Sequence, residues 1–243
     1  MTHTGNRCEE SAIAVARRNA TAPGHDDYIE SAWLEVDGDF ESYWAARGKK
    51  LRQNLRRQRN KLAAEGISAS LRWLREPDEI ADALRRYGSL ESAGWKAGRG
   101  TAIHPDNVQG RYYLELFEHA ARRGEALLNE YRFGEQTVAM NLGLLRHGTW
   151  TVLKTAYDEA VAKPLSPASL LREEVLQQIF AGRAGVRRIE YYGRVMEWHT
   201  RLTDHRRGLY HLTTFRWPGL KRLRQRQRVQ KRNDAPTPES SEG

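Results

Sequence analysis

The chain has 243 residues, a formal net charge of +9 and a single cysteine. One cysteine excludes an intramolecular disulfide, and Cys8 has no histidine beside it in the irregular N-terminal region, which argues against a catalytic thiol. No apolar run approaches the roughly 18 residues that a membrane span needs, and the N-terminus lacks the order of a signal peptide. We therefore expect a cytoplasmic protein without a transmembrane segment.

The positive charge is concentrated in two segments. Residues 47–61 and 216–232 each hold eight basic residues and no acidic one, and subtracting these sixteen charges from +9 leaves −7 for the rest of the chain. Such segments predict contact with RNA or another anionic polymer, above all through residues 47–61, or else a solvated helix face and a basic tail. No helix-turn-helix order, zinc-ligand spacing or aromatic RNA-binding signature accompanies them.

The first part of the chain predicts a strand and helices. Leucines 51, 55 and 62 share one face of a basic helix, and residues 67–73 alternate as in a half-buried strand. Pro77 opens a helix that runs through residue 87, and a glycine-rich loop over 90–106 carries Trp95. Asp106 is expected to cap the helix that follows.

Three strands come next, over 126–133, 137–146 and 150–157, separated by hairpin-sized intervals that contain glycine. This spacing predicts an antiparallel meander. On the middle strand, Asn141 lies on a face of small residues that leaves room for a ligand or a helix. Later strands are expected over 186–192 and 211–215.

The stretch from Trp150 to Phe180 combines a strand, a short loop and a helix. Ser166 suits the N-cap of that helix and Pro167 its first position. Unsatisfied backbone N–H groups and the helix dipole favour an anion at such a terminus. The stretch therefore predicts an anion-binding site.

The order of these elements resembles that of the Gcn5-related N-acetyltransferase (GNAT) superfamily. The segments that carry the resemblance are LRQNLRRQRNKL from Leu51, LESAGWKAGRGTAI from Leu90, TVLKTAYDEAVAKPLSPASLL from Thr151 and IEYYG from Ile189. They are similar to the acetyltransferase-like proteins encoded with cellulose and exopolysaccharide biosynthesis, which are relatives of the FemAB-type transferases. The resemblance spans about residues 45–215.

The resemblance implies an α/β (α+β) fold with a mixed, largely antiparallel sheet flanked by helices. It implies a remnant strand and basic helix over 28–65 and an acyltransferase domain over 66–217. Composition and pattern predict a disordered or irregular N-terminus over 1–27 and a basic then polar disordered tail over 218–243. The resemblance also implies acetyl-CoA as acyl donor, no metal, and a sheet that opens after the strand ending at Tyr157. The residues expected to bind the donor at the following helix are Ser166, Ala168, Ser169 and Leu170.

Acyl transfer to an amine or hydroxyl needs a base for the acceptor, an acid for the departing thiolate and a donor for the thioester oxygen. Asp158 or Glu159 is the candidate base and Tyr157 the candidate acid; the alternative is a solvated strand end. Simple alternation along the strand places the Lys154 side chain on the same side of the sheet as Val152. Its partner there would be a carboxylate elsewhere in the chain or a bound phosphate; alternatively, Lys154 is an edge lysine that reaches water.

The acceptor implied by the resemblance is an amine or hydroxyl of a sugar or a cell-envelope or exopolysaccharide precursor. The residues expected near it are Trp95, Lys96, Asn141 and His199. One alternative is a FemAB-like aminoacyl transferase that uses aminoacyl-tRNA. Another is a catalytically degenerate GNAT-like module that binds a partner through its basic helix.

Overall fold

The computed structural model describes residues 24–93, 103–104, 107–161 and 165–213. Residues 29–208 form one compact unit, and the described residues 24–28 and 209–213 fall outside it. This unit contains the candidate functional site. The predictions for residues 1–23 and 218–243, and those for Trp95, Lys96 and Asp106, lie outside the described residues.

One seven-stranded sheet organises the chain, in the order β2-β3-β4-β5-β6-β1-β7. The pairs β2–β3, β3–β4, β4–β5 and β6–β1 are antiparallel, whereas β5 and β6 run parallel. The predicted mixed, largely antiparallel sheet and its central meander β3-β4-β5 are therefore confirmed. The strands are β1 (Gly24–Glu35), β2 (Ala69–Leu74), β3 (Leu128–Phe133), β4 (Gln136–Arg146), β5 (Thr149–Tyr157), β6 (Arg188–Tyr191) and β7 (Arg206–Thr213).

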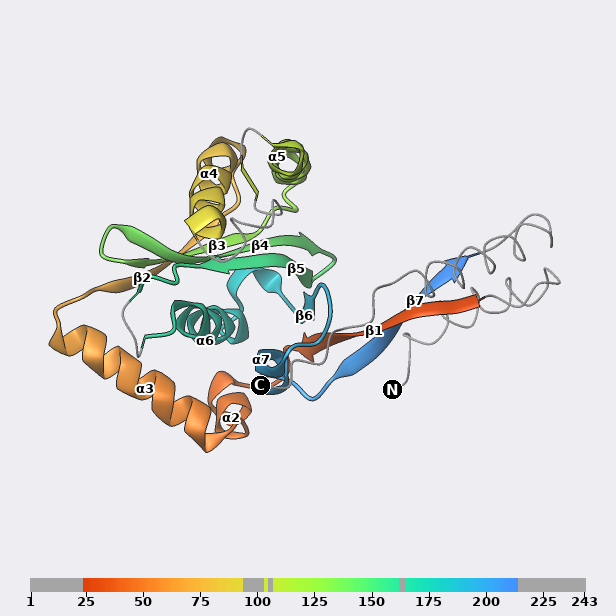
Figure 1. The fold of residues 1–243 in the computed structure, drawn as a ribbon. Helices are drawn as coiled ribbons and strands as arrows, with labels where there is room; N and C mark the ends of the chain where they lie inside the picture. The colour runs from red at the N-terminus through yellow and green to blue at the C-terminus, as the bar shows by residue number, and fades with distance from the viewer. Residues whose placement is uncertain (1–23, 94–102, 105–106, 162–164, 214–243) are drawn as a thin grey trace, which may run out of the picture. The chain divides into compact units, whose positions relative to one another are not determined.

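Helices cover both faces of the strands β2 to β5 (Figure 1). On one face lie α4 and α5, and on the other lies α6, with α3 beyond it. The predicted helical coverage is thereby confirmed. The helices are α2 (Phe40–Ala45), α3 (Lys49–Ala64), α4 (Pro77–Ala93), α5 (Val108–Arg122), α6 (Pro167–Phe180) and α7 (Glu197–Thr200), with a 3-10 turn at Arg183–Gly185.

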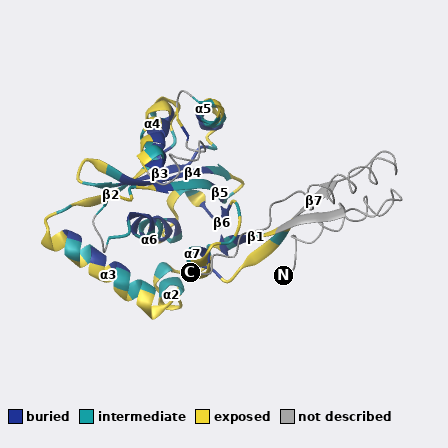
Figure 2. Ribbon diagram, viewed as in Figure 1, coloured by how far each residue is buried: buried dark blue, intermediate teal, exposed yellow. Residues whose placement is uncertain are grey.

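Each face of the sheet has its own apolar core. Met140 and Leu142 of β4 pack with α4 and α5, whereas Trp150 of β5 packs with α6 and with Leu55 and Leu62 of α3. Figure 2 shows the buried stripe of α3 turned toward the molecule and its exposed residues turned outward. The basic helix is therefore anchored by its leucines, as its amphipathic pattern predicts.

Several boundaries differ from the sequence prediction, among them that of the last strand, which begins at Arg206, and the two on either side of the predicted loop. The loop expected from residue 90 begins later, because α4 continues to Ala93. Gly88 remains helical there, and a side chain at this position would come within 2.6 Å of the Ile103 carbonyl oxygen, so close packing requires the glycine. The cap of α5 is Asn107, whose side chain accepts a hydrogen bond of 2.7 Å from Gly110 N–H.

A β-bulge in β5 changes which way its side chains point. Lys154 lies opposite Leu142, but Val152 lies opposite the next residue of β4, Gly143, so Leu153 is an extra residue in β5. Val152 consequently packs into the core on the α6 side, while Lys154 extends toward α4 and α5. The prediction that these two side chains share a side was wrong because it assumed uninterrupted alternation.

Gly143 makes room for the Trp150 indole, whose Nε1–H donates to Leu127 O at 3.0 Å. A Cβ at this buried position would overlap that indole, so we expect Gly143→Ala to lower the free energy of unfolding by about 1–3 kcal/mol. Urea denaturation measures this change. The matched control is Gly48→Ala, where a Cβ meets nothing within 4 Å; equal losses in the two variants would contradict the packing argument.

Candidate functional site

A wedge-shaped opening separates β5 from β6. Their parallel pairing ends at Val152 and Tyr191, and the last bond, from Tyr192 N–H to Val152 O, is 3.0 Å long. Since β5 continues to Tyr157, its last five residues lie beyond the end of β6. This side of β5 is a strand edge able to pair with an extended ligand.

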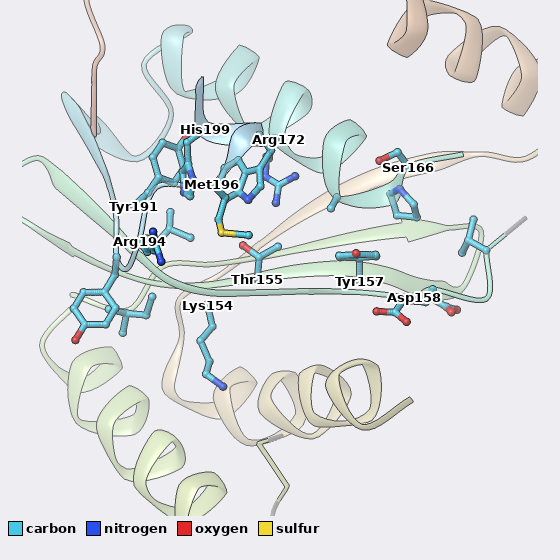
Figure 3. Close-up of a pocket in the computed structure, with 18 of the residues that line it drawn as sticks. Lys154, Thr155, Tyr157, Asp158, Ser166, Arg172, Tyr191, Arg194, Met196 and His199 are labelled. Carbon is cyan, nitrogen blue, oxygen red and sulfur yellow. The ribbon is translucent and has the colours of Figure 1, made fainter. Parts of the chain in front are cut away.

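The cavity beside this edge has a volume of about 690 Å³, which is within the usual range of about 300–1,000 Å³ for small-molecule sites. Its walls are β5, the beginning of α6 and the connection from β6 to α7 (Figure 3). Tyr157, Tyr192 and Met196 expose 42%, 71% and 56% of their surface. Clustered exposed apolar side chains around a cavity are typical of a ligand site.

The first turn of α6 borders this cavity, as the sequence predicts. Ser166 occupies the N-cap position, but its hydroxyl bonds Ser169 Oγ at 2.9 Å and caps no backbone N–H. Its own N–H donates to Gln58 Oε1 of α3 at 2.7 Å. The expected capping by the Ser166 side chain was therefore wrong, and α3 contributes to the terminus instead.

Few backbone N–H groups at the N-terminus of α6 are left without a hydrogen-bond partner among the described residues. The N–H groups of Ser169 and Leu170 both donate to Ser166 O, at 2.9 and 3.1 Å, and Pro167 has no N–H. Ala168 keeps the one backbone N–H of the first turn that bonds nothing among the described residues. Of the four residues predicted to bind the donor, Ala168 is the one whose backbone donor is free.

The three residues at the end of β5 differ in how far their polar groups are engaged. Asp158 accepts from Gln136 Nε2 and from Ala160 N–H, each at 2.8 Å, and so closes the turn after the strand. Tyr157 and Glu159 also line the cavity, and within the described part of the chain their side chains make no hydrogen bond or ion pair. The polar groups of Tyr157 and Glu159 are therefore more available for a reaction than the Asp158 carboxylate.

Lys154 has a protein partner on the other face of the sheet. Its Nζ lies 3.1 Å from Glu91 Oε1 and 5.4 Å from the centre of the Tyr113 ring. Glu91 is almost fully buried and also accepts from Ile103 N–H at 2.7 Å. Of the partners considered for this lysine, a carboxylate elsewhere in the chain is the one observed.

Asn141 is buried beneath the cavity. Its Oδ1 accepts from Thr155 Oγ1 at 2.7 Å, and its amide contacts Asn129 Oδ1 at 3.5 Å. These bonds hold Thr155 in the cavity wall. Asn141 thus supports a lining residue, whereas the sequence analysis expected it near the acceptor itself.

His199 lies in the cavity wall as a buried side chain. Its Nδ1 accepts from Met196 N–H at 2.8 Å, its ring stacks on Trp198 with centroids 3.5 Å apart, and Tyr191 contacts it edge-on. Burial lowers the pKa of His199 to about 4. The imidazole is therefore neutral at pH 7, and because Nδ1 accepts, Nε2 carries the proton.

Arg172 of α6 is a lining residue that the sequence analysis missed. Its guanidinium lies over the Trp198 ring, 3.8 Å from the centroid (Figure 3). Burial lowers its pKa to about 10, so it stays charged at neutral pH. A signal was present in the sequence, because Arg172 falls on the same helical stripe as Ala168 and Val175, both buried.

The model of the acetyltransferase (GNAT) domain family matches residues 49–215, more than half of the chain. The chain belongs to this family. The match contains the opened strand pair, the cavity and α6. A search of curated proteins gives no match.

Solved structures resemble the chain in fold. The L-PGS structure from Bacillus licheniformis is 13% identical with a TM-score of 0.53, and the match covers 88% of this chain and 68% of that one. FemX is 9% identical with a TM-score of 0.50, covering 90% and 71%. A conserved protein of unknown function from Bacteroides thetaiotaomicron is 14% identical with a TM-score of 0.48, covering 77% of this chain and only 57% of its own.

Among the described residues, no helix is long and apolar enough to cross a membrane. Nor do they contain a group of three or more His, Cys, Asp or Glu side chains suited to a metal ion.

The lowered pKa of His199 predicts a pH-dependent stability. The unfolded chain takes up a proton near pH 6.5 but the folded chain only near pH 4, so stability is full above pH 6.5 and falls as the pH drops toward 4. His199→Asn keeps an acceptor for Met196 N–H but does not titrate. We expect wild-type unfolding free energy to fall by about 2–3 kcal/mol more than that of the variant across this interval. Parallel curves in urea denaturation would contradict a neutral buried imidazole.

Proposed function

We propose that the protein transfers an acyl group from acyl-CoA to an amine or hydroxyl of a sugar or cell-envelope precursor. The observation that carries this proposal is the end of β5–β6 pairing at Val152, which leaves a strand edge beside a cavity of about 690 Å³. Membership in the GNAT family supports the reaction class. The sugar or envelope acceptor follows from the sequence resemblance alone.

The wall of the cavity fits an acyl-CoA donor. The pantetheine arm is extended and carries amide groups, which suit the free edge of β5 between Leu153 and Tyr157. The free N–H of Ala168 and the positive end of the α6 dipole favour a phosphate at the cavity mouth. Bound acyl-CoA supplies an activated thioester; the protein supplies position, charge and protons.

The free polar groups suggest roles. Tyr157 stands on the strand edge and would protonate the leaving thiolate, and Glu159 would accept the proton of the attacking amine or hydroxyl. His199 would donate its Nε2–H to an oxygen within the cavity and would not act as a base, because Nδ1 is already occupied. Asp158 would hold the turn that carries Glu159.

The aminoacyl-tRNA alternative draws support from a second groove. It has a volume of about 910 Å³ and lies along α3 and α7, where Arg47 and Arg201 are paired with Asp204 and Glu197. The remaining cations in its lining are Lys50 and Arg57. Such a surface fits an anionic polymer, so residues 47–61 stay the proposed place for one.

A charge added to the first turn of α6 tests the donor site. Ser169→Glu places a carboxylate where it favours the helix dipole but repels a phosphate. We expect at least a tenfold loss of CoA affinity by isothermal titration calorimetry, about 1.4 kcal/mol, with thermal stability unchanged or raised. Val108→Glu is the matched control, because it adds the same charge to the first turn of α5 at a position 75% exposed.

Equal CoA affinity in the two variants would contradict a donor site at α6. If wild-type protein binds no CoA and binds tRNA in a salt-sensitive manner, the aminoacyl transferase replaces the present proposal. Binding of neither ligand would favour a degenerate module.

The role of Tyr157 can be tested separately. Tyr157→Phe removes the phenolic proton and keeps the ring, so we expect kcat to fall by about 10²-fold while the Kd for CoA stays constant. Release of CoA from acetyl-CoA, followed with a thiol reagent, gives the rate. Tyr112→Phe, an exposed change on α5, serves as control. An unchanged kcat in Tyr157→Phe would remove the tyrosine from the proton transfer.

A further inference from the structure

Arg172 is a cation whose guanidinium N–H groups make no hydrogen bond to the described residues. It stacks on Trp198 through the face of the guanidinium, which leaves the in-plane N–H donors free. The residues that the structure describes place no carboxylate within ion-pair distance of it and no acceptor within hydrogen-bond distance. The side chain is partly exposed and lines the cavity, so an anion that enters the cavity can reach these donors.

The neighbouring polar side chains have partners other than Arg172. Glu173 and Glu174, next to it on α6, lie 3.1 and 3.5 Å from Arg59 of α3. In the cavity wall, Thr155 Oγ1 donates to Asn141 Oδ1 at 2.7 Å. Among the described residues, the guanidinium therefore has no carboxylate partner where it lines the cavity.

The rest of the lining holds charges of both signs. Arg194, on the connection from β6 to α7, is exposed and lines the same cavity (Figure 3). The carboxylate of Asp158 is bound within its own turn, and Glu159 lies with it at the end of β5. Arg172 follows Pro167 by five residues, which is about 7.5 Å along the helix axis from the terminus proposed for the donor phosphates.

We propose that the acceptor substrate carries a carboxylate or phosphate that binds Arg172, with Arg194 assisting at the rim. This inference rests on the proposed acyl transfer and specifies its acceptor as an anionic amine- or hydroxyl-bearing compound. A planar guanidinium forms two parallel hydrogen bonds with either group, so both share the recognised chemistry. Trp198 holds the guanidinium flat and thereby orients the anion.

Three amino sugars that differ in charge serve as probes. Glucosamine is the cationic reference, glucosamine 6-phosphate adds a phosphate, and muramic acid adds a carboxylate. We expect kcat/KM for at least one anionic probe to exceed that for glucosamine by about 10- to 100-fold, the usual effect of a charge-assisted hydrogen bond, and the difference to lie in KM. Comparison of the two anionic probes distinguishes phosphate from carboxylate.

Variants assign this preference to Arg172. In Arg172→Gln the ratio of kcat/KM between the anionic probe and glucosamine should fall toward one, and Arg172→Lys should keep part of it. The ratio is taken within one variant, so a general loss of folded protein cancels. Arg183→Gln is the matched control, because Arg183 also lies over an indole, that of Trp73 at 5.9 Å, but does not line the wedge.

Calorimetry without acyl donor separates this inference from the proposed function. If no probe releases CoA, but an anionic sugar binds wild type and binds Arg172→Gln at least tenfold more weakly, acyl transfer to amino sugars is refuted and the anion site stands. A preference that persists in Arg172→Gln, or equal use of all three probes, overturns the inference. So does the absence of anionic-sugar binding to wild-type protein.

Discussion

The geometry of the site depends on the unequal pairing of β5. This strand pairs with β4 along its whole length but with β6 only from Thr149 to Val152. A continued parallel pair would satisfy the peptide groups of residues 153–157 within the sheet and leave no cavity. The bulge at Leu153 falls at the point of separation, where it also turns Lys154 to the opposite face. The bulge at Leu153 therefore coincides with two features: the unpaired edge of β5 beside the cavity and the ion pair between Lys154 and Glu91.

The two faces of the sheet treat buried charge differently. On the α4 and α5 side, charges are satisfied within the protein: Lys154 pairs with Glu91, and the buried Glu130 accepts from Arg86, Arg72 and Thr137. On the α6 side, Arg172 has the cavity in place of a partner. Closed networks stabilise one arrangement, whereas a charge that lines a cavity is available to a ligand. The first face acts as a scaffold, and the proposed binding site lies on the second.

The sequence predicts the elements well because they follow from local pattern. Spacing and turn chemistry within a few residues determine the hairpins at Gly134 and Gly148, the strands of the meander and the start of α6 at Pro167. The bulge at Leu153 has no such local signature. The engagement of Ser166 by Gln58 joins residues 108 positions apart and was likewise beyond local reasoning. Arg172 was missed because the sequence analysis considered only the first turn of α6 as a binding element.

The position of Arg172 constrains how the acceptor specificity of this protein can evolve. It sits on a helix that is tied to α3 through Arg59 and packs into the apolar core through Leu171 and Val175. Many enzymes alter their substrates by remodelling surface loops, which tolerate insertion and drift. Here a new acceptor charge requires replacement of one side chain on a packed helix. We therefore expect the acceptor specificity to change through single substitutions at Arg172 during evolution. Gradual broadening of the specificity should be rare.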